Sequence, residues 1–469
     1  MQITQLLKKS LLLNLLNVVS KITHLFFFIY VSSKVSLNDF GIYGYVNLAT
    51  QYFFLFSVII TSSVIREVPI DDEIDYQISD GKLSWSIFID TLFFIIPIGL
   101  CIVFYLFSVG GNESYLFLLV GFFIIFQKFN QIWSSIAIIR SSLDFLFKSR
   151  LVQLISFSLG FLIAMQFNLL LALVVYPYIG YLASWLYLFL KRLFSFSLKN
   201  PFPDKQRIVK AGIQLQFLTI TYWAFTLSDR TLVALIFDTE SLGIYTLIST
   251  LVLFSRQAIG EFLNLLQPYI LKEIELRKNM DKKLETITYL IALASILVVF
   301  ALQISFYFLT KYYAIQYFNY VDALNILSYS LFFIAISGIS GTILTSKTLP
   351  KIHISIYLSL LGIIINVVLI FIFVKYNYGL HGVALSSVIS ISIIGFIQFW
   401  FSKPLIFKSK SELNTLLVFA FFPPFIILAV QQIFFNSNVY FSIAAFVFFT
   451  IVCLYLILNK ACIKKLLKK

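Results

Sequence analysis

Charged side chains stand inside runs of apolar residues that are otherwise long enough to span a lipid bilayer. Five of them are cations, namely Lys21, Arg66, Lys128, Arg230 and Arg256. A charge at the centre of a membrane costs about 3 kcal/mol, so such a side chain normally faces other helices or a water-filled cavity. Lysine and arginine bind anions, and the arginine guanidinium can hold two phosphate oxygens at once. These residues predict a cationic interior suited to a negatively charged ligand.

The first apolar run carries its polar residues at helical spacing. Asn14, Asn17, Lys21 and His24 follow one another at intervals of three, four and three residues, which places them on one helix face. For Asn14 or Asn17 alone, a hydrogen bond between helices is the simpler interpretation, whereas Lys21 in the middle favours a hydrated cavity. We predict that all four side chains bind the same ligand as Arg66, Lys128, Arg230 and Arg256.

Carboxylates lie in the same apolar runs, at Asp90, Asp229 and Glu261. Two interpretations remain open for them. Asp90 can pair with Lys128, and Asp229 or Glu261 with Arg256, as structural ion pairs. Alternatively, they are ion-coupling groups that titrate or bind sodium.

Arg66 has a structural alternative of its own. It ends the second apolar run and is followed directly by Glu67. Its side chain can extend to the membrane interface or pair with that carboxylate, instead of binding a ligand.

The composition indicates an all-α polytopic membrane protein. Hydrophobic residues make up 60% of the 469 residues and charged residues 12%, and the mean hydropathy is +0.94. A span needs about 20 apolar residues, and counting such stretches predicts about fourteen helices. They lie near 10–32, 41–65, 84–108, 114–138, 150–167, 169–190, 211–236, 243–268, 284–309, 321–346, 354–374, 379–402, 413–434 and 439–459.

The distribution of positive charge predicts the orientation. With both termini in the cytoplasm, the external loops contain only Lys34, Lys311 and Lys375, while most of the 35 lysines and arginines fall in cytoplasmic segments. The formal net charge of +14 is therefore a signal for orientation beside anionic membrane lipids. It does not indicate a nucleic-acid partner.

The sequence lacks the features of an enzyme. It contains no phosphate-binding glycine loop, no zinc-binding H-E-x-x-H and no nucleophile elbow. Its three cysteines, Cys101, Cys453 and Cys462, are far apart and form no metal-binding pattern. No loop is long enough to form a catalytic domain. We expect no enzymatic activity, no cofactor and no metal.

A short phrase occurs twice. Leu37 to Tyr43 and Thr239 to Tyr245 both place Gly-Ile-Tyr after a polar gap, 202 residues apart. The repeat predicts two related halves: a six-helix bundle over 1–192, a cytoplasmic linker over 193–210 and a second six-helix bundle over 211–402. Residues 403–469 then add two helices and a basic cytoplasmic tail.

The chain resembles the Wzx-type O-antigen and polysaccharide flippases of the multidrug/oligosaccharidyl-lipid/polysaccharide (MOP) exporter superfamily. The residues that carry the resemblance are the two repeated phrases, Ile65-Arg66, Asp229-Arg230 and the stretch from Gly379 to Ala384. The resemblance implies two six-helix bundles in a V shape, as in MATE transporters. It also implies a function in which charged residues at Arg66, Asp229 and Arg230 line a central cavity.

The resemblance and the cationic interior together predict a flippase of the bacterial inner membrane. Its cargo would be a polyprenyl-diphosphate-linked oligosaccharide, such as a lipopolysaccharide O-antigen unit, and a polysaccharide polymerase would be a partner. A lipid II flippase and a multidrug or cation antiporter of the same superfamily remain alternatives. A membrane polysaccharide polymerase is a more distant one, because such enzymes carry a large basic external loop.

Overall fold

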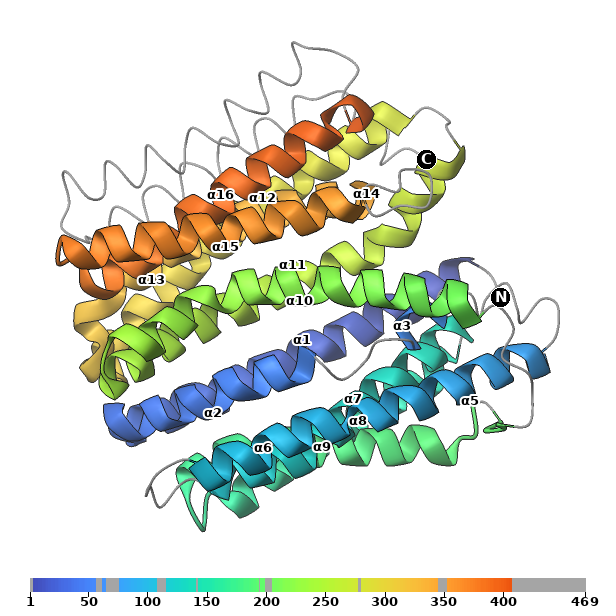
Figure 1. Cartoon of the computed structure of the whole chain (residues 1–469), viewed down its shortest axis with the longest axis horizontal. Helices are drawn as coiled ribbons and strands as arrows, with labels where there is room; N and C mark the ends of the chain where they lie inside the picture. The colour runs from blue at the N-terminus through green and yellow to red at the C-terminus, as the bar shows by residue number, and fades with distance from the viewer. Residues whose placement is uncertain are drawn as a thin grey trace. The chain divides into compact units, whose positions relative to one another are not determined.

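The computed structural model of the protein describes residues 3–55, 61–64, 76–107, 115–140, 142–193, 195–198, 205–276, 280–344 and 352–406, and within them it contains helices and no strand (Figure 1). The helices of residues 3–236 are α1 (Ile3–Lys34), α2 (Leu37–Leu55), α3 (Thr61–Val64), α5 (Tyr76–Phe93), α6 (Ile95–Phe107), α7 (Tyr115–Ile139), α8 (Leu143–Ala164), α9 (Leu169–Leu190) and α10 (Lys205–Ile236). Those that follow are α11 (Thr239–Leu276), α12 (Met280–Tyr312), the 3-10 helix η1 (Ile315–Tyr320), α13 (Val321–Ser328), α14 (Ser330–Leu344), α15 (Ile352–Lys375) and α16 (Gly379–Ile406).

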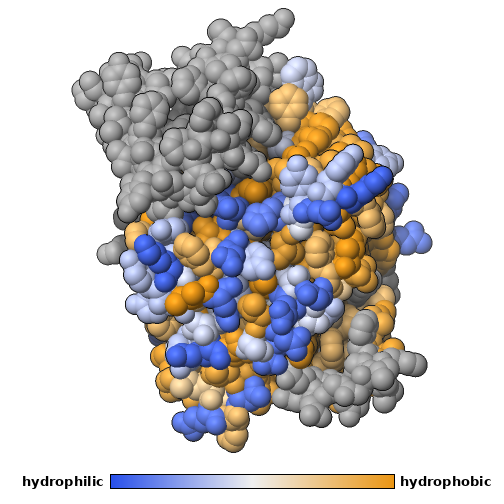
Figure 2. All heavy atoms as spheres, turned by 90° about the vertical axis from the view of Figure 1, so that its left-hand side faces the viewer, coloured by the Kyte–Doolittle hydropathy of each residue, from blue (hydrophilic) through white to orange (hydrophobic). Residues whose placement is uncertain are grey.

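The all-α membrane architecture predicted from the composition is confirmed. Eight helical segments of the described residues are long and apolar enough to cross a membrane. Each of the first twelve predicted spans coincides with one helix or with two consecutive helices. The predicted spans 413–434 and 439–459 lie outside the described residues. In Figure 2, hydrophilic residues lie among hydrophobic ones on the face that is shown.

Two predicted spans are interrupted within the described residues. The span 84–108 is divided into α5 and α6 beside Pro97. A proline ring clashes with the carbonyl group four residues earlier, here that of Phe93, where α5 ends. The span 321–346 is divided as well, into α13 and α14. The break predicted between the spans 150–167 and 169–190 is present, because the Asn168 side chain accepts hydrogen bonds from Leu170 N (2.7 Å) and Leu171 N (3.1 Å) and so begins α9.

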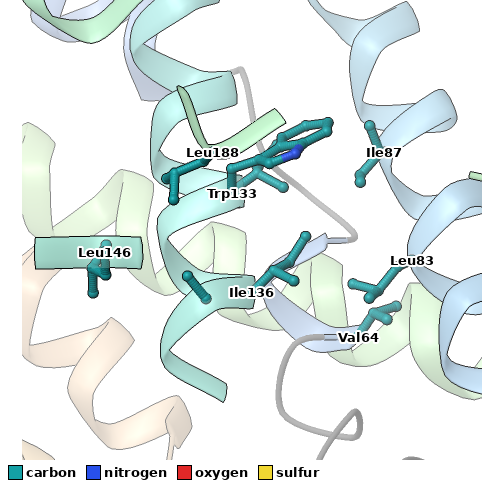
Figure 3. Packing of buried hydrophobic residues seen from close by; sticks show 9 residues of the cluster. Val64, Leu83, Ile87, Trp133, Ile136, Leu146 and Leu188 are labelled. Atoms are coloured by element: carbon teal, nitrogen blue, oxygen red, sulfur yellow. The ribbon is translucent and has the colours of Figure 1, made fainter. Parts of the chain in front are cut away.

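The chain divides into two compact units, Met1–Gly243 and Ile244–Lys469. In the first unit, α8 packs along α9, α7 packs on α9, and α10 packs on α2 and α3. Its best-defined apolar core joins α3, α5, α7, α8 and α9 through Val64, Leu83, Ile87, Trp133, Ile136, Leu146 and Leu188 (Figure 3).

The second unit is held by small side chains as well as apolar ones. Helix α16 packs on α13, α14 and α15. Ser402 Oγ donates to Ser340 Oγ on α14 (2.9 Å), and Ser386 Oγ donates to Asn366 Oδ1 on α15 (3.0 Å). Buried hydroxyl contacts between closely packed helices are typical of membrane bundles.

The repeated phrase begins a capped helix in both places. Ser36 Oγ accepts a hydrogen bond from Asp39 N (3.1 Å) at the start of α2. At the start of α11, Asp238 Oδ1 accepts one from Ser241 N (2.8 Å). Hydrogen bonds from the Ser241 side chain and from the Ser241 backbone N–H lower the pKa of the Asp238 carboxyl group. In both cases a side-chain oxygen binds a backbone N–H three residues later, as expected for a helix N-cap.

The two glycines of the repeated phrase pack against each other's segments. A Cβ atom on Gly41 would overlap the carbonyl oxygen of Thr239, and one on Gly243 would overlap that of Leu37 and lie 2.8 Å from Gly41 N. The starts of α2 and α11 are therefore in backbone contact, which only glycine permits.

Replacing Gly41 by alanine should destabilise the protein by about 1–3 kcal/mol, because the added methyl group forces the two helix starts apart. The change is measured as a lower thermal unfolding midpoint of the purified protein in detergent. Gly99→Ala on α6 is the matched control, since a Cβ there meets nothing within 4 Å. Equal stability of the two variants would contradict the close contact.

Candidate functional site

Helix α10 places its charged pair inside the first unit. Asp229 and Arg230 are 7% and 5% exposed. The helix is held on α2 by two hydrogen bonds, one between the hydroxyl groups of Tyr52 and Thr231 (2.7 Å) and one from Tyr45 Oη to the carbonyl oxygen of Ala234 (3.0 Å). These bonds fix the depth of the charged pair beside α2.

Two tyrosines of α2 lie near this pair. The Arg230 guanidinium interacts electrostatically with the Tyr43 hydroxyl, and the Asp229 carboxylate with that of Tyr52. Asp229 Oδ1 also accepts a hydrogen bond from Arg230 N (2.7 Å). The arrangement therefore places a cation, a carboxylate and phenolic hydroxyl groups together at the α2–α10 contact.

A second charged pair joins α5 and α7. Asp90 is fully buried and Lys128 is 5% exposed, and the two side chains interact electrostatically. Asp90 Oδ2 accepts a hydrogen bond from the backbone N–H of Thr61 at the start of α3 (2.8 Å). The Lys128 ammonium group donates to Gln131 Oε1 (3.5 Å). The electrostatic interaction agrees with the predicted pairing of Asp90 with Lys128. The hydrogen bond from Thr61 also joins α3 to this pair.

Gln131 indicates the surroundings of the Asp90–Lys128 pair. Its side chain is exposed, although it lies within the apolar span Leu116–Ala137. An amide in the middle of a span is costly against lipid, so it faces water or other polar groups. Lys128 therefore interacts with both a buried carboxylate and an exposed amide.

The polar stripe of α1 reaches an aromatic cluster. His24 Nδ1 forms a hydrogen bond with the Tyr176 hydroxyl on α9. Tyr176 is fully buried and packs edge-on against Phe161, which stacks on Phe27 with ring centroids 4.0 Å apart. His24 is therefore anchored to α9 at the end of the stripe.

The remaining residues predicted for the site lie on α1 and α11 or outside the described residues. Asn17 and Lys21 are half-buried on α1, and Asn14 lies in the same helix with its side chain outside the described set. In the second unit, Arg256 is half-buried on α11, and Glu261 lies in that helix without a described side chain. Arg66 lies outside the described residues.

A buried ion pair at another place in the first unit was not predicted as part of a site. Arg140 Nη2 donates to Asp80 Oδ1 (2.7 Å), and Arg140 Nη1 donates to the carbonyl oxygen of Leu193 (2.6 Å). Asp80 Oδ2 accepts from Ser195 N (2.8 Å). The pair thus attaches the segment after α9 to α5 and α7.

The tyrosines around the charged groups were also not predicted. Tyr176 and Tyr178 flank Pro177 within α9, and both are buried. Hydroxyl-bearing aromatic residues clustered around a proline inside a span are a signal that could have identified them, because a buried phenol needs a hydrogen-bond partner.

The chemistry that these groups suit is the binding of an anion. Within the described residues, no three His, Cys, Asp or Glu side chains are grouped so as to hold a metal ion. The lysine and arginine side chains offer several donors each, which suit anionic oxygens. The tyrosines add hydroxyl groups and ring faces.

Comparison with known proteins identifies the fold. No family model and no curated protein matches the sequence. The structure is similar to the lipid II flippase MurJ in an inward closed conformation, with a TM-score of 0.67 and 18% identity over 97% of this chain and 100% of the flippase.

Two further solved structures have the same fold. An inward-facing MATE multidrug resistance transporter of the MOP superfamily has a TM-score of 0.63 and 12% identity, over 84% of this chain and 94% of the transporter. A MOP superfamily transporter from Pyrococcus furiosus has a TM-score of 0.52 and 12% identity, over 85% and 95%. The chain is therefore a multi-pass membrane protein with the fold of the MOP superfamily transporters.

Proposed function

We propose that this protein is a flippase that moves a polyprenyl-diphosphate-linked oligosaccharide across the bacterial inner membrane, toward the external leaflet. The observation that carries the proposal is the burial of Lys128 and Arg230 inside a fold shared with a lipid II flippase. Burying a cation at membrane depth costs free energy, so a cation that is retained there normally serves a function. An anionic head group is the cargo that they suit.

The cargo explains the kinds of side chain that are present. A diphosphate accepts charge-assisted hydrogen bonds from lysine and arginine, and sugar rings pack on aromatic faces such as those of Tyr43 and Tyr52. The polyprenyl tail can remain in lipid while only the polar head is sheltered. An O-antigen or other surface-polysaccharide repeat unit has this chemistry.

The direction of transport follows from the charge of the cargo. With a membrane potential that is negative inside, moving about two negative charges outward is favoured by roughly 4–5 kcal/mol per 100 mV. Alternating access of the two halves would open the site first to the cytoplasm and then outward. From the distribution of lysine and arginine, we expect both termini to lie in the cytoplasm.

The main competing function is export of organic cations, as a multidrug antiporter. A cation pocket would offer carboxylates without compensating cations, whereas the Asp90 carboxylate interacts electrostatically with Lys128. The lipid II flippase also aligns with a larger share of this chain than the multidrug transporter does. Both observations favour a lipid-linked anion.

The proposal is tested with the purified full-length protein in liposomes that contain a fluorescent polyprenyl-diphosphate oligosaccharide. We expect protein-dependent movement of the label between leaflets, and we expect excess undecaprenyl diphosphate to compete with it. Liposomes loaded with ethidium provide the comparison. Transport of ethidium without movement of the lipid would replace the proposed function with cation export.

A separate arm distinguishes the alternative flippase function. Lipid II carries a peptide as well as sugars on its diphosphate, so the same liposomes are prepared with lipid II. Movement of lipid II at a rate equal to or above that of an O-antigen unit would assign the protein to peptidoglycan precursors. We expect the oligosaccharide without a peptide to move faster.

A further inference from the structure

Helices α8 and α9 bring three cations together at one end of their hairpin. Lys148 lies in the second turn of α8, and Lys191 and Arg192 directly follow α9; all three side chains are exposed. The two helices pack along their length and run antiparallel, so the start of one meets the end of the other (Figure 1). The distribution of lysine and arginine predicts that this end faces the cytoplasm.

Aromatic rings hold one of these cations in place. The Lys191 ammonium group lies over the ring of Phe145 on α8, 5.7 Å from its centroid, and over that of Tyr187 on α9, 5.3 Å from its centroid. Such cation–π contacts restrain the side chain without neutralising its charge. Aromatic residues of this kind are enriched at the level of lipid head groups.

Arg192 occupies a position that favours glycine. Its φ of 50° is left-handed, and it follows the C-cap Lys191, where helices usually place glycine. Its N–H donates to the carbonyl oxygen of Phe189 (3.1 Å). Glycine would adopt this turn without strain. The chain places a cation there instead, beside Lys191.

An apolar stripe leads away from the cations along α8. Phe145, Ile155, Leu159 and Leu162 are exposed and recur at helical spacing, in line with Lys148. On α9, Leu186, Phe189 and Leu190 are exposed next to Lys191. A lipid whose acyl chains lie on this stripe would bring its head group to the three cations.

We propose that Lys148, Lys191 and Arg192 form a binding site for the head group of an anionic phospholipid. The charge of the three side chains selects a negative head group, and the apolar stripe of α8 accommodates the acyl chains. The exposed carboxylate of Asp144, in the first turn of α8, lies at this helix end and opposes binding. The site does not depend on which cargo the protein carries.

The test is native mass spectrometry of the full-length protein, released from detergent after incubation with equal amounts of phosphatidylglycerol and phosphatidylcholine. We expect the wild type to retain phosphatidylglycerol preferentially. Each of Lys148→Gln, Lys191→Gln and Arg192→Gly should reduce the retained phosphatidylglycerol about fivefold, as expected for the loss of one cation near an anionic surface. Asp144→Asn should increase it.

Arg192→Gly separates lipid binding from folding. Glycine suits the left-handed turn, so this variant should unfold at the wild-type temperature or above and still lose the lipid. Lys311→Gln is the matched control, because Lys311 also lies over two rings at a helix end, those of Tyr307 and Tyr312. It should retain phosphatidylglycerol as the wild type does.

Two results would overturn the site. One is equal retention of phosphatidylglycerol and phosphatidylcholine by the wild type. The other is loss of phosphatidylglycerol in Lys311→Gln to the same degree as in Lys191→Gln. That result would show that lipid retention depends only on the net charge of the protein. Neither result tests the proposed flippase function, which is measured as movement of the lipid-linked cargo between leaflets.

Discussion

Replacing Arg230 by glutamine should abolish movement of the lipid-linked oligosaccharide while leaving the protein inserted in the membrane. The guanidinium is buried near the Tyr43 hydroxyl, where its interactions with an anionic head group are not weakened by bulk water. Loss of one partner from a buried, charge-assisted contact costs about 2–5 kcal/mol, which corresponds to a reduction of roughly 30-fold or more. The measurements are the rate of lipid movement in liposomes and the amount of surface polysaccharide in cells.

Two companion variants make this result interpretable. Arg230→Lys keeps the charge but loses the planar pair of donors, so we expect partial activity. The double variant Asp229→Asn/Arg230→Gln removes both charges and leaves no buried carboxylate without its cation. If the double variant is stable and moves the lipid at the wild-type rate, Arg230 does not bind the cargo.

Arg256 is expected to behave in the same way, because it is the cation of the second unit that we predict to bind the diphosphate. Normal surface polysaccharide in both Arg230→Ala and Arg256→Ala would contradict the proposed cationic site.

Replacing Asp80 by alanine should destabilise the first unit by about 3–5 kcal/mol, the usual cost of removing one partner from a buried salt bridge. The carboxylate binds Arg140 Nη2 and Ser195 N, both within 2.8 Å, so its loss leaves a guanidinium and a backbone N–H without their acceptor. We expect a clear decrease in the thermal unfolding midpoint of the purified protein in detergent.

Asp80→Asn and Glu240→Ala complete this experiment. Asparagine can still accept a hydrogen bond from Ser195 N but loses the charge, so its stability should lie between those of alanine and the wild type. Glu240 is an exposed carboxylate at the start of α11, where removal should change stability by less than about 1 kcal/mol. If Asp80→Ala and Glu240→Ala unfold at the same temperature, the buried pair does not stabilise the unit.

The helices could be predicted because their signals are local. Apolar runs of membrane length and the break at Asn168 depend on residues within a few positions of each other. The division of α5 from α6 had a local signal as well, Pro97, which the count of apolar residues overlooked.

The site could be predicted only in part. Charge within an apolar run predicted that Lys128, Arg230 and Asp90 face away from lipid, and all three are buried. Their role in binding stays a prediction. The helical spacing of α1 placed His24 on the face of Lys21, but it could not show that His24 binds Tyr176, 152 residues away. A helical period gives the direction of a side chain and not its neighbour.

The same limit explains the contacts that only the tertiary structure decided. From the sequence alone, Arg140 is one of the cations of a predicted cytoplasmic segment that indicate orientation. In the structure, packing of α5 against α7 buries it against Asp80, 60 residues earlier. The repeated Gly-Ile-Tyr phrase marks two related helix starts, and only the fold brings Gly41 against the Thr239 segment. By itself the sequence determined the membrane class and the positions of the helices, and it predicted a cationic interior. Tertiary packing decided contacts such as Arg140 with Asp80 and His24 with Tyr176, because those partners lie on helices that are distant in sequence.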